Sequence, residues 1–534
     1  MAAFHVHART VSLLTFVSRI SGLLREAVLA RVFGVGPAMD AFAFAFMLPN
    51  LFRRLFGEGA LSSAFLPVYS KMESEEPRSA GRLAWLVLGR TTMLLAALTL
   101  VGELVLAMVP AESADRGLLL RLAMVMLPYM PMVCLVALLG AVLQVHHRFG
   151  PTAAAPIILN VGVAGTALVA GAMLKGDGWQ SAAITWVSIS VLLGGVIQLV
   201  WAARALSNAG LDLRGAARTP SPKADEGFRT VLTRTLPMVL GMGVLQINTF
   251  IDGLIASYPT AFGPTIFGRE FPLPEGSMAT LSWAQRLYEF PLGVFGIAVA
   301  TAIFPALSRQ AGEVEVFRGT LIRALRLSFF IGLPASLVLM VLARPSVAAV
   351  FQGGDFTAED SSRVAWVLAG YALAIWAYSI NQTLTRAFYA RGENMTPVRV
   401  AVSMVVLNFL LNITLIWTPL GVAGLAVSTA ICAAIQCCWL SLLLSRRIGD
   451  FFTEELRQSA GRTVVVGIAT AAVALGAALG AERALLPAIG LAPDSWGAAV
   501  VTLAAALPLG AATAFVCAKM LGMRELAWAL GREG

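Results

Sequence analysis

The stretch FVSRISGLLREAVLARVFGVGPAMDAFAFAFMLPNLFRRLFGEGALSSAF, residues 16–65, contains two long apolar segments interrupted by ionisable side chains. A helix needs about 20 predominantly apolar residues to cross a bilayer, and both segments are long enough. A charge at the bilayer centre costs about 2.5–3.5 kcal/mol on insertion scales, so several charges within such segments indicate a functional role. The charged residues in this stretch that call for such an explanation are Arg19, Arg25, Glu26, Asp40, Arg53, Arg54 and Glu58.

Similar apolar segments continue along the whole chain. Of its 534 residues, 58% are hydrophobic and 13% are charged, whereas soluble chains have about 25% charged residues. Backbone groups in lipid must be hydrogen-bonded within their own segment, which favours helices and predicts an all-α polytopic membrane protein. We expect about fourteen spanning helices, at residues 10–34, 41–69, 83–109, 119–145, 152–174, 182–205, 230–256, 278–308, 319–343, 362–388, 397–418, 421–445, 462–482 and 496–520.

Every second predicted loop is rich in Lys and Arg. Short basic loops stay in the cytoplasm, so both chain termini are predicted to be cytoplasmic. This asymmetry accounts for the net charge of +9 without nucleic-acid binding. The five cysteines lie in apolar segments without metal-ligand spacing, which predicts neither disulfides nor a zinc site.

A polar segment rich in Gly and Pro, residues 207–229, divides the chain. The motifs SAFLPVYSK (63–71) and TAIFPALSR (301–309) resemble each other and occupy corresponding places before and after it. The sequence therefore predicts two parallel six-helix lobes around a central cavity, as in transporters that alternate access to a central site. The predicted parts are the N-lobe 1–206, the cytoplasmic linker 207–229, the C-lobe 230–447, and two accessory helices with a cytoplasmic tail in 448–534.

The buried charges allow two interpretations. In a helix Glu26 returns to the face of Arg19, and Arg286 and Glu289 are three residues apart, so these residues could form purely structural ion pairs. However, arginines outnumber acids in these segments. A surplus of guanidinium groups suits a ligand with phosphate or pyrophosphate, which arginine binds through paired hydrogen bonds.

The motif SRISGLLREAVLARVFGVGPAMDAFAFAFMLPNLFRRLFGEGALSSAFLPVYSK (18–71), with WAQRLYEFPLGVFGIAVATAIFPALSR (283–309), closely resembles the MurJ (MviN) family of lipid II flippases. The resemblance extends over nearly the whole chain. It implies the fold of the multidrug/oligosaccharidyl-lipid/polysaccharide exporter superfamily, with a V-shaped cavity and two further helices that form a groove for a lipid tail. It also implies that the chain moves lipid II, the undecaprenyl-pyrophosphate-linked peptidoglycan precursor, to the outer leaflet of a bacterial cytoplasmic membrane.

The same resemblance implies roles for individual residues. The cavity arginines of the family match Arg19, Arg25, Arg53 and Arg286. We expect Arg19, Arg25 and Arg286 to bind the pyrophosphate, and Arg53 to bind substrate or take part in gating. The remaining charged residues are expected to serve gating or contacts between the lobes: Asp40, Glu26, Arg54, Glu58 and Glu289.

The sequence contains no Walker motif and no catalytic triad, so we expect neither an enzyme nor a cofactor. Transport is expected to use the membrane potential, a cation gradient, or both. Asp252 is an isolated acid at membrane depth, and Asn408 and Asn412 share one helix face. Some family members have a sodium site in the corresponding lobe, which makes these residues a possible Na⁺ site; hydrogen bonding between helices is the alternative.

Other functions fit parts of the sequence. An O-antigen-type lipid-linked oligosaccharide flippase and a cation-coupled drug exporter belong to the same superfamily, although an exporter of cationic drugs should line its cavity with acids. A scaffold that recruits the cell-wall synthesis machinery would leave the cavity charges incidental. Lipid II and membrane lipids are the expected partners.

Overall fold

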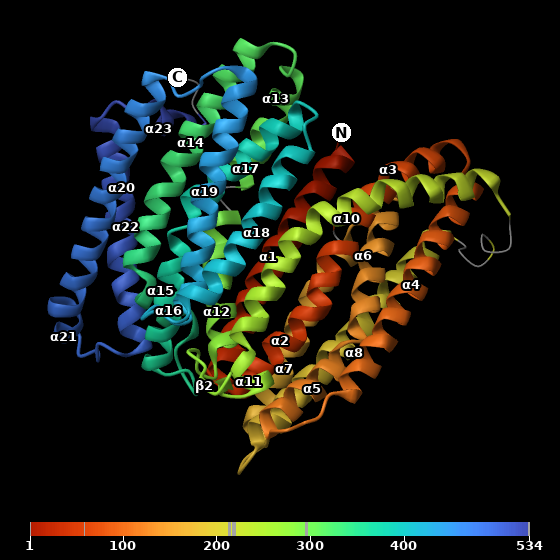
Figure 1. Cartoon of the computed structure of the whole chain (residues 1–534), viewed down its shortest axis with the longest axis horizontal. Coiled ribbons are helices and arrows are strands. Elements are labelled where there is room, and N and C mark those ends of the chain that lie inside the picture. The colour runs from red at the N-terminus through yellow and green to blue at the C-terminus, as the bar shows by residue number, and fades with distance from the viewer. Residues whose placement is uncertain (1, 58, 212–214, 216–219, 294–296, 532–534) are drawn as a thin grey trace. The chain divides into compact units, whose positions relative to one another are not determined.

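The computed structural model describes all residues except 1, 58, 212–214, 216–219, 294–296 and 532–534. The described chain is almost entirely α-helical (Figure 1), with one short antiparallel hairpin of β1 (Thr265–Ile266) and β2 (Arg269–Glu270). It packs as two compact units, Met1–Ala279 (unit 1) and Thr280–Gly534 (unit 2). The prediction of an all-α polytopic membrane protein is confirmed.

Unit 1 is built mainly from long helices. In chain order it contains α1 (Ala2–Phe33), α2 (Pro37–Phe52), the π-helical segment η1 (Arg53–Gly57), α3 (Ala60–Glu75), α4 (Pro77–Met108), α5 (Ala114–Met126), α6 (Tyr129–Val145), α7 (Gly150–Met173), α8 (Trp179–Ser207), α10 (Pro222–Ala256), α11 (Tyr258–Phe262), and the β1–β2 hairpin.

The helix α12 (Ser277–Pro291) begins in unit 1 and continues into unit 2. Unit 2 then contains α13 (Ile297–Arg309), α14 (Val314–Val341), α15 (Ala343–Phe351), α16 (Ala358–Ala372), α17 (Ile375–Ala390), α18 (Met395–Leu415), α19 (Ala423–Ile448), α20 (Glu454–Gly480), the π-helical segment η3 (Ala481–Leu485), α21 (Leu486–Ala488), α22 (Trp496–Met520) and α23 (Arg524–Ala529).

Ten helical segments of the described chain are long and apolar enough to cross a membrane. They correspond to ten of the predicted spans. The others, 10–34, 41–69, 230–256 and 278–308, are formed by α1, by α2 to α3, by α10, and by α12 with α13. The helices α2 and α3 have 16 residues each, α12 has 15 and α13 has 13, so each is too short to count alone, whereas α1 and α10 are long but contain ionisable residues. The total of fourteen spans therefore stays a prediction.

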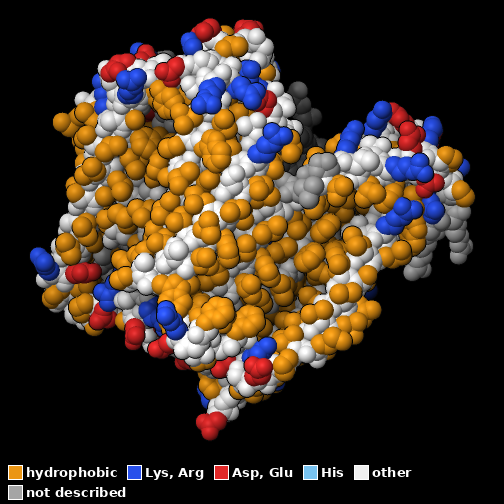
Figure 2. Space-filling view, in the orientation of Figure 1, with side chains coloured by type: hydrophobic (Ala, Val, Ile, Leu, Met, Phe, Trp, Pro, Cys, Tyr) orange, Lys and Arg blue, Asp and Glu red, His pale blue; other side chains and the backbone are white. Residues whose placement is uncertain are grey.

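Exposed apolar side chains fit a lipid surrounding. Figure 2 shows them along the sides of the helices, whereas Lys, Arg, Asp and Glu gather near the helix ends. Inside unit 1, a buried cluster that includes Phe65, Leu83 and Leu138 joins α3, α4 and α6. The helix α10 packs against α3 and α4 within this unit. The division into lobes at residues 207–229 stays a prediction. The boundary between the two compact units falls elsewhere along the chain, after Ala279.

The last two long helices, α20 and α22, pack closely through small residues. Ala474, Ala478 and Ala506 are buried where they meet, and a Cβ atom on Gly510 would lie 3.4 Å from the Cβ of Ala474. Small side chains allow backbones in a membrane to approach each other closely. Near η3 these helices leave an apolar pocket of about 340 Å³, lined by Ala477, Gly480, Ala481, Ala484, Leu485, Ala488, Ala505 and Leu509.

Candidate functional site

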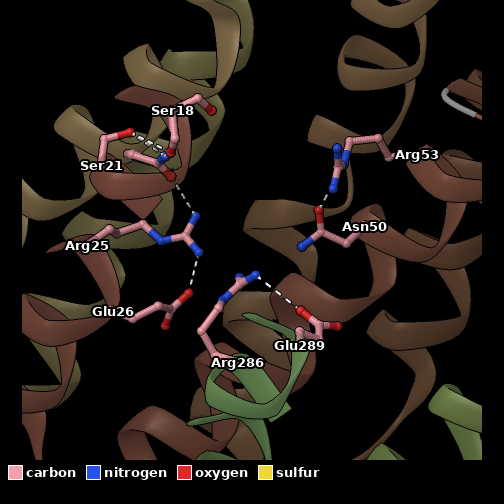
Figure 3. A network of polar contacts seen from close by, with 9 residues as sticks. Ser18, Ser21, Arg25, Glu26, Asn50, Arg53, Arg286 and Glu289 are labelled. Carbon is pink, nitrogen blue, oxygen red and sulfur yellow. Dashed lines mark hydrogen bonds and ion pairs between the residues drawn. The ribbon is translucent and has the colours of Figure 1, made fainter. Parts of the chain in front are cut away.

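Among the predicted cavity arginines, Arg25 on α1 is buried, with only 6% of its surface exposed. Its Nη2 forms a short ion pair with Glu26, and its Nη1 donates a hydrogen bond to Asn160 Oδ1 at 3.0 Å (Figure 3). The guanidinium carbon also lies 5.5 Å from the centre of the Phe46 ring, a favourable cation–π distance. The Arg25 side chain is therefore fixed by contacts with α1, α2 and α7.

Asn160, on α7, connects Arg25 back to α1. Its Nδ2 donates to Ser21 Oγ at 2.9 Å and approaches the carbonyl oxygen of Ser18 at 3.4 Å. Ser21 Oγ in turn donates to the Ser18 carbonyl at 2.9 Å. The sequence pattern did not indicate Asn160, Ser18 or Ser21 as site residues, because a single Asn in an apolar helix gives no signal of its tertiary partner.

Arg19 differs from Arg25. Its side chain is exposed, and among the described residues the structure shows no carboxylate within ion-pair distance of it. The ion pair shown for Glu26 is with Arg25, not with Arg19 as the structural interpretation of the sequence supposed. Arg19 is thus an accessible cation on the same helix as a paired, buried one.

The arginines of the second predicted span lie in an irregular segment. The sequence predicts one helix over 41–69, but the helix is interrupted at Arg53–Gly57, where the backbone becomes π-helical. Pro49 lies inside α2 and cannot donate a backbone hydrogen bond, and π-helical turns are frequent at functional sites. Arg53 Nε donates to Asn50 Oδ1 at 3.2 Å (Figure 3), and Arg54 is exposed. Glu58 lies outside the described residues.

Asp40 is fully buried near the start of α2 and binds the beginning of α12. Its Oδ1 accepts a hydrogen bond from the Ala279 backbone N–H at 2.8 Å, and its Oδ2 accepts from the Gly276 N–H at 2.7 Å and from Thr260 Oγ1 at 3.0 Å. A carboxylate at a helix N-terminus is favoured by the free N–H groups there. Gly276 has φ +84°, which favours glycine, and a Cβ there would clash with Val35.

Arg286 lies further along the same helix, α12. Its Nη1 is 3.6 Å from Glu289 Oε2, and both side chains are about two-fifths exposed (Figure 3). Nearby contacts hold α12 against α16, because Tyr288 stacks on Tyr371 at 4.7 Å and Gln285 donates to the Tyr371 hydroxyl at 2.9 Å. The predicted Arg286–Glu289 pair is therefore present, on a helix whose orientation is fixed within unit 2.

The predicted cation-site residues on α18 form a neutral network with α19. Asn408 Nδ2 donates to Ser428 Oγ at 3.2 Å and lies 3.4 Å from Thr429 Oγ1. Asn412 Nδ2 donates to Asn408 Oδ1 at 2.9 Å, and Ser428 Oγ donates to Asn412 Oδ1 through a short hydrogen bond. The amide oxygens that would bind a cation thus accept hydrogen bonds from neighbouring donors.

Asp252, the third predicted cation-site residue, is buried on α10 in unit 1. Its Oδ2 accepts a hydrogen bond from Asn248 Nδ2 at 3.3 Å. Within the described residues no group of three or more His, Cys, Asp or Glu side chains could hold a metal ion. The possible sodium site stays a prediction.

The arrangement in α1 and α7 suits an anionic ligand. Arg25 has one carboxylate partner, and its Nε, buried from solvent, has no hydrogen-bond partner in the described structure. Arg19 adds an accessible guanidinium about one and a half turns away on the same helix. Guanidinium groups bind phosphate oxygens through charge-assisted, often paired, hydrogen bonds.

The fold is shared with known exporters. The structure described as "Lipid II flippase MurJ, inward closed conformation" aligns with 96% of this chain and 99% of its own, with a TM-score of 0.72 and 21% identity. An inward-facing MATE family transporter of the MOP superfamily covers 82% of this chain and 98% of its own, with a TM-score of 0.63 and 17% identity. These likenesses show that the chain has the helical fold shared by MurJ and the MATE transporters.

Sequence similarity defines the family more closely. The family described as "Lipid II flippase MurJ" matches residues 29–486, and the chain belongs to this family. "Lipid II flippase MurJ" of Burkholderia cenocepacia is 30% identical over 456 residues, covering 82% of this chain and 83% of the relative. "Probable lipid II flippase MurJ" of Vibrio cholerae is 32% identical over 447 residues, covering 80% of each. These relatives are named as flippases, which agrees with the expectation that the chain is not an enzyme.

Proposed function

We propose that this chain flips lipid II from the inner to the outer leaflet of the bacterial cytoplasmic membrane by alternating access. The observation that carries the proposal is membership of the lipid II flippase family over residues 29–486. The apolar exterior and the arginines of α1 support it, because the substrate combines a long lipid with a pyrophosphate. Both chain termini are cytoplasmic in this proposal, following the basic loops of the sequence.

In the proposed mechanism, Arg19, Arg25 and Arg286 bind the pyrophosphate. Without substrate, Glu26 pairs with Arg25, and Glu289 lies beside Arg286. The pyrophosphate oxygens compete with these carboxylates for the guanidinium donors. Such exchange keeps the arginines compensated in both states, and it allows the substrate to leave when the carboxylates re-form their ion pairs.

Gating is assigned to the second predicted span and to Asp40. The hydrogen bonds from Thr260, Gly276 and Ala279 hold α2 to the start of α12. Breaking them would free the first turn of the helix that continues to Arg286 and Glu289. Arg53 and Arg54 lie in the π-helical interruption, where a helix can change direction. Glu58, which lies outside the described residues, is assigned to gating from the resemblance to the family alone.

The apolar pocket between α20 and α22 is a place for the lipid tail. Its lining consists only of Ala, Gly and Leu side chains, which present no polar group to a hydrocarbon chain. This assignment follows from the resemblance to the family and is supported by the chemistry of the lining. It gives the two accessory helices a role beyond their mutual packing.

The membrane potential is the proposed source of energy. An anionic headgroup that leaves the cell moves with an inside-negative potential, worth about 2.3 kcal/mol per charge per 100 mV. Sodium coupling through Asp252, Asn408 and Asn412 is the second possibility. The network of α18 and α19 favours the potential, because the amide oxygens of Asn408 and Asn412 already accept hydrogen bonds from neighbouring donors.

Complementation tests this proposal. Expression of the wild-type chain should restore growth of a bacterial strain depleted of its own lipid II flippase. An O-antigen-type flippase or a drug exporter would not restore growth. The Arg286→Ala variant should accumulate lipid-linked precursor and lyse although it is inserted normally, whereas a scaffold for the cell-wall synthesis machinery would still support growth.

A further inference from the structure

The buried hydrogen bond between Arg25 and Asn160 joins two residues that are 135 positions apart in the sequence. Asn160 is 6% exposed, and its amide is engaged at both ends. The oxygen accepts from Arg25, while the nitrogen donates to Ser21 and approaches the Ser18 carbonyl. This arrangement requires an acceptor on one side and a donor on the other, which an amide provides and an apolar side chain does not.

The Asn160 amide lies beside the backbone of α1 at Gly22. A Cβ atom on Gly22 would lie 3.5 Å from Asn160 Nδ2, which is van der Waals contact. There it reaches Ser21 and Arg25 on either side of Gly22. The position of the Arg25 guanidinium is thus set from α7 as well as by Glu26 of its own helix.

The charge of the partner distinguishes Asn160 from Glu26. Glu26 neutralises Arg25, whereas the Asn160 amide holds the same guanidinium without neutralising it. The buried Arg25 Nε also has no hydrogen-bond partner in the described structure, which leaves a donor for a further acceptor. A second carboxylate in place of the amide would compensate Arg25 from two sides and compete with an anionic ligand.

We infer that Asn160 is a positioning residue for substrate binding: it orients the Arg25 guanidinium through a neutral hydrogen bond and so keeps its charge available for the diphosphate of the substrate. The inference rests on the proposed function and extends it to a residue on α7. It predicts that position 160 must be both polar and uncharged. A purely structural role would require only that the helices stay packed.

The test compares three variants in two measurements, the dissociation constant for purified lipid II and the thermal unfolding temperature of the purified protein in detergent. Asn160→Asp retains an acceptor for Arg25 but loses the donor to Ser21, so its unfolding temperature should fall less than that of Asn160→Leu, whereas lipid II should bind about tenfold more weakly. Asn160→Leu should lose both binding and stability. Gln198→Leu is the matched control, because it removes another buried amide, which donates to the Ala155 carbonyl at 2.6 Å; it should lower stability and leave binding unchanged.

A double variant tests whether the effect passes through Arg25. In an Arg25→Ala background, Asn160→Asp should weaken lipid II binding no further. Wild-type affinity in Asn160→Asp, or an undiminished effect of Asp in the Arg25→Ala background, would overturn the inference and leave the proposed function intact. If the wild-type chain and the Gln198→Leu control fail to bind lipid II, the proposed function fails and this inference fails with it.

Discussion

Burial of a carboxylate is unfavourable unless hydrogen-bond donors replace the water that it loses. Asp40 has three such donors, of which two are backbone N–H groups at the start of α12. These backbone donors belong to the open end of the helix, where the first N–H groups have no partner within the helix itself. Asp40 therefore stabilises the start of α12 as well as its own burial.

Replacement of Asp40 by Ala should lower the free energy of unfolding by about 3 kcal/mol, because it leaves two backbone donors without their charged acceptor. Asp40→Asn retains one carbonyl oxygen and should cost less. Thermal unfolding of the purified variants measures both effects, with the exposed Asp177→Asn as a control. If Asp40→Ala unfolded at the wild-type temperature, the hydrogen bonds to Gly276 and Ala279 would not have the assigned strength.

Arginine and lysine have the same charge but differ in their donors. The planar guanidinium binds two oxygens at once, whereas the lysine ammonium binds as a point charge. Arg19→Lys and Arg286→Lys should therefore each reduce lipid II flipping about tenfold in reconstituted vesicles, with the protein inserted normally. Arg309→Lys, an exposed arginine at the end of α13, should flip like the wild type. Full flipping activity of Arg19→Lys and Arg286→Lys would show that a positive charge alone is sufficient at these two positions.

At the residue scale, helical spacing predicted one of the two expected ion pairs and none of the contacts with neutral partners. The Arg286–Glu289 pair follows from helical spacing, and the structure contains it. Glu26 was expected near Arg19, because both lie on the same face of the helix, whereas the adjacent residues Arg25 and Glu26 point about 100° apart. Instead the long Arg25 side chain reaches Glu26. Asn160 could not be predicted, because its partner lies on another helix.

Among the elements, α23 forms the clearest local assembly outside the predicted site. Glu525 is buried and accepts hydrogen bonds from Arg326 Nε at 2.6 Å and from Ser459 Oγ at 2.5 Å, which joins α23 to α14 and α20. Trp528 adds cation–π contacts, with the Arg323 and Arg326 guanidinium carbons 5.0 and 5.1 Å from its ring centre. The short helix thus fastens the accessory helices to the rest of unit 2.

Glu525→Gln should weaken this docking by about 1.5–3 kcal/mol, the value typical of a hydrogen bond to a charged group. Hydrogen exchange of the backbone amides in 524–529 measures the change, with the exposed Glu313→Gln as a control.

The same docking should depend on pH. Burial raises the pKa of Glu525, but the hydrogen bonds from Ser459 and Arg326 have the larger combined effect and lower the pKa below the ordinary value of 4.5. The docking energy is therefore fully present above about pH 5 and is lost as the pH falls through the lowered pKa. Loss of protection already at pH 6 would contradict this assignment.

At the element scale, apolar runs of the sequence predicted the positions of the helices well, but not their internal breaks. The π-helical segment after α2 interrupts the expected helix 41–69. Pro49 indicated a possible kink, whereas the backbone geometry of Arg53–Gly57 depends on packing that the sequence pattern does not contain. The four expected spans outside the ten long apolar segments contain most of the predicted site residues, and charged side chains are what makes these spans less apolar or irregular.

On the scale of the whole molecule, the sequence motifs were sufficient to predict the family, and the match over residues 29–486 confirms it. The energy source could not be predicted in the same way. Sodium binding depends on whether several oxygen atoms from different helices converge, which a spacing of four residues between Asn408 and Asn412 does not determine. The hydrogen bonds of these two amides provide a physical basis for choosing between the possible sources.

Transport should respond to the membrane potential and not to sodium. In vesicles with lipid II in the inner leaflet, an inside-negative potential of 100 mV favours export of each negative charge by about 2.3 kcal/mol, so collapse of the potential by a potassium ionophore should slow flipping. Replacement of sodium by choline should have little effect, because α18 and α19 contribute only neutral groups to their network. Asn412→Asp would add a carboxylate with affinity for a hard cation and should make flipping sensitive to sodium. Sodium-dependent flipping by the wild type would instead favour a cation site at Asp252, Asn408 and Asn412, with amide oxygens as sufficient ligands.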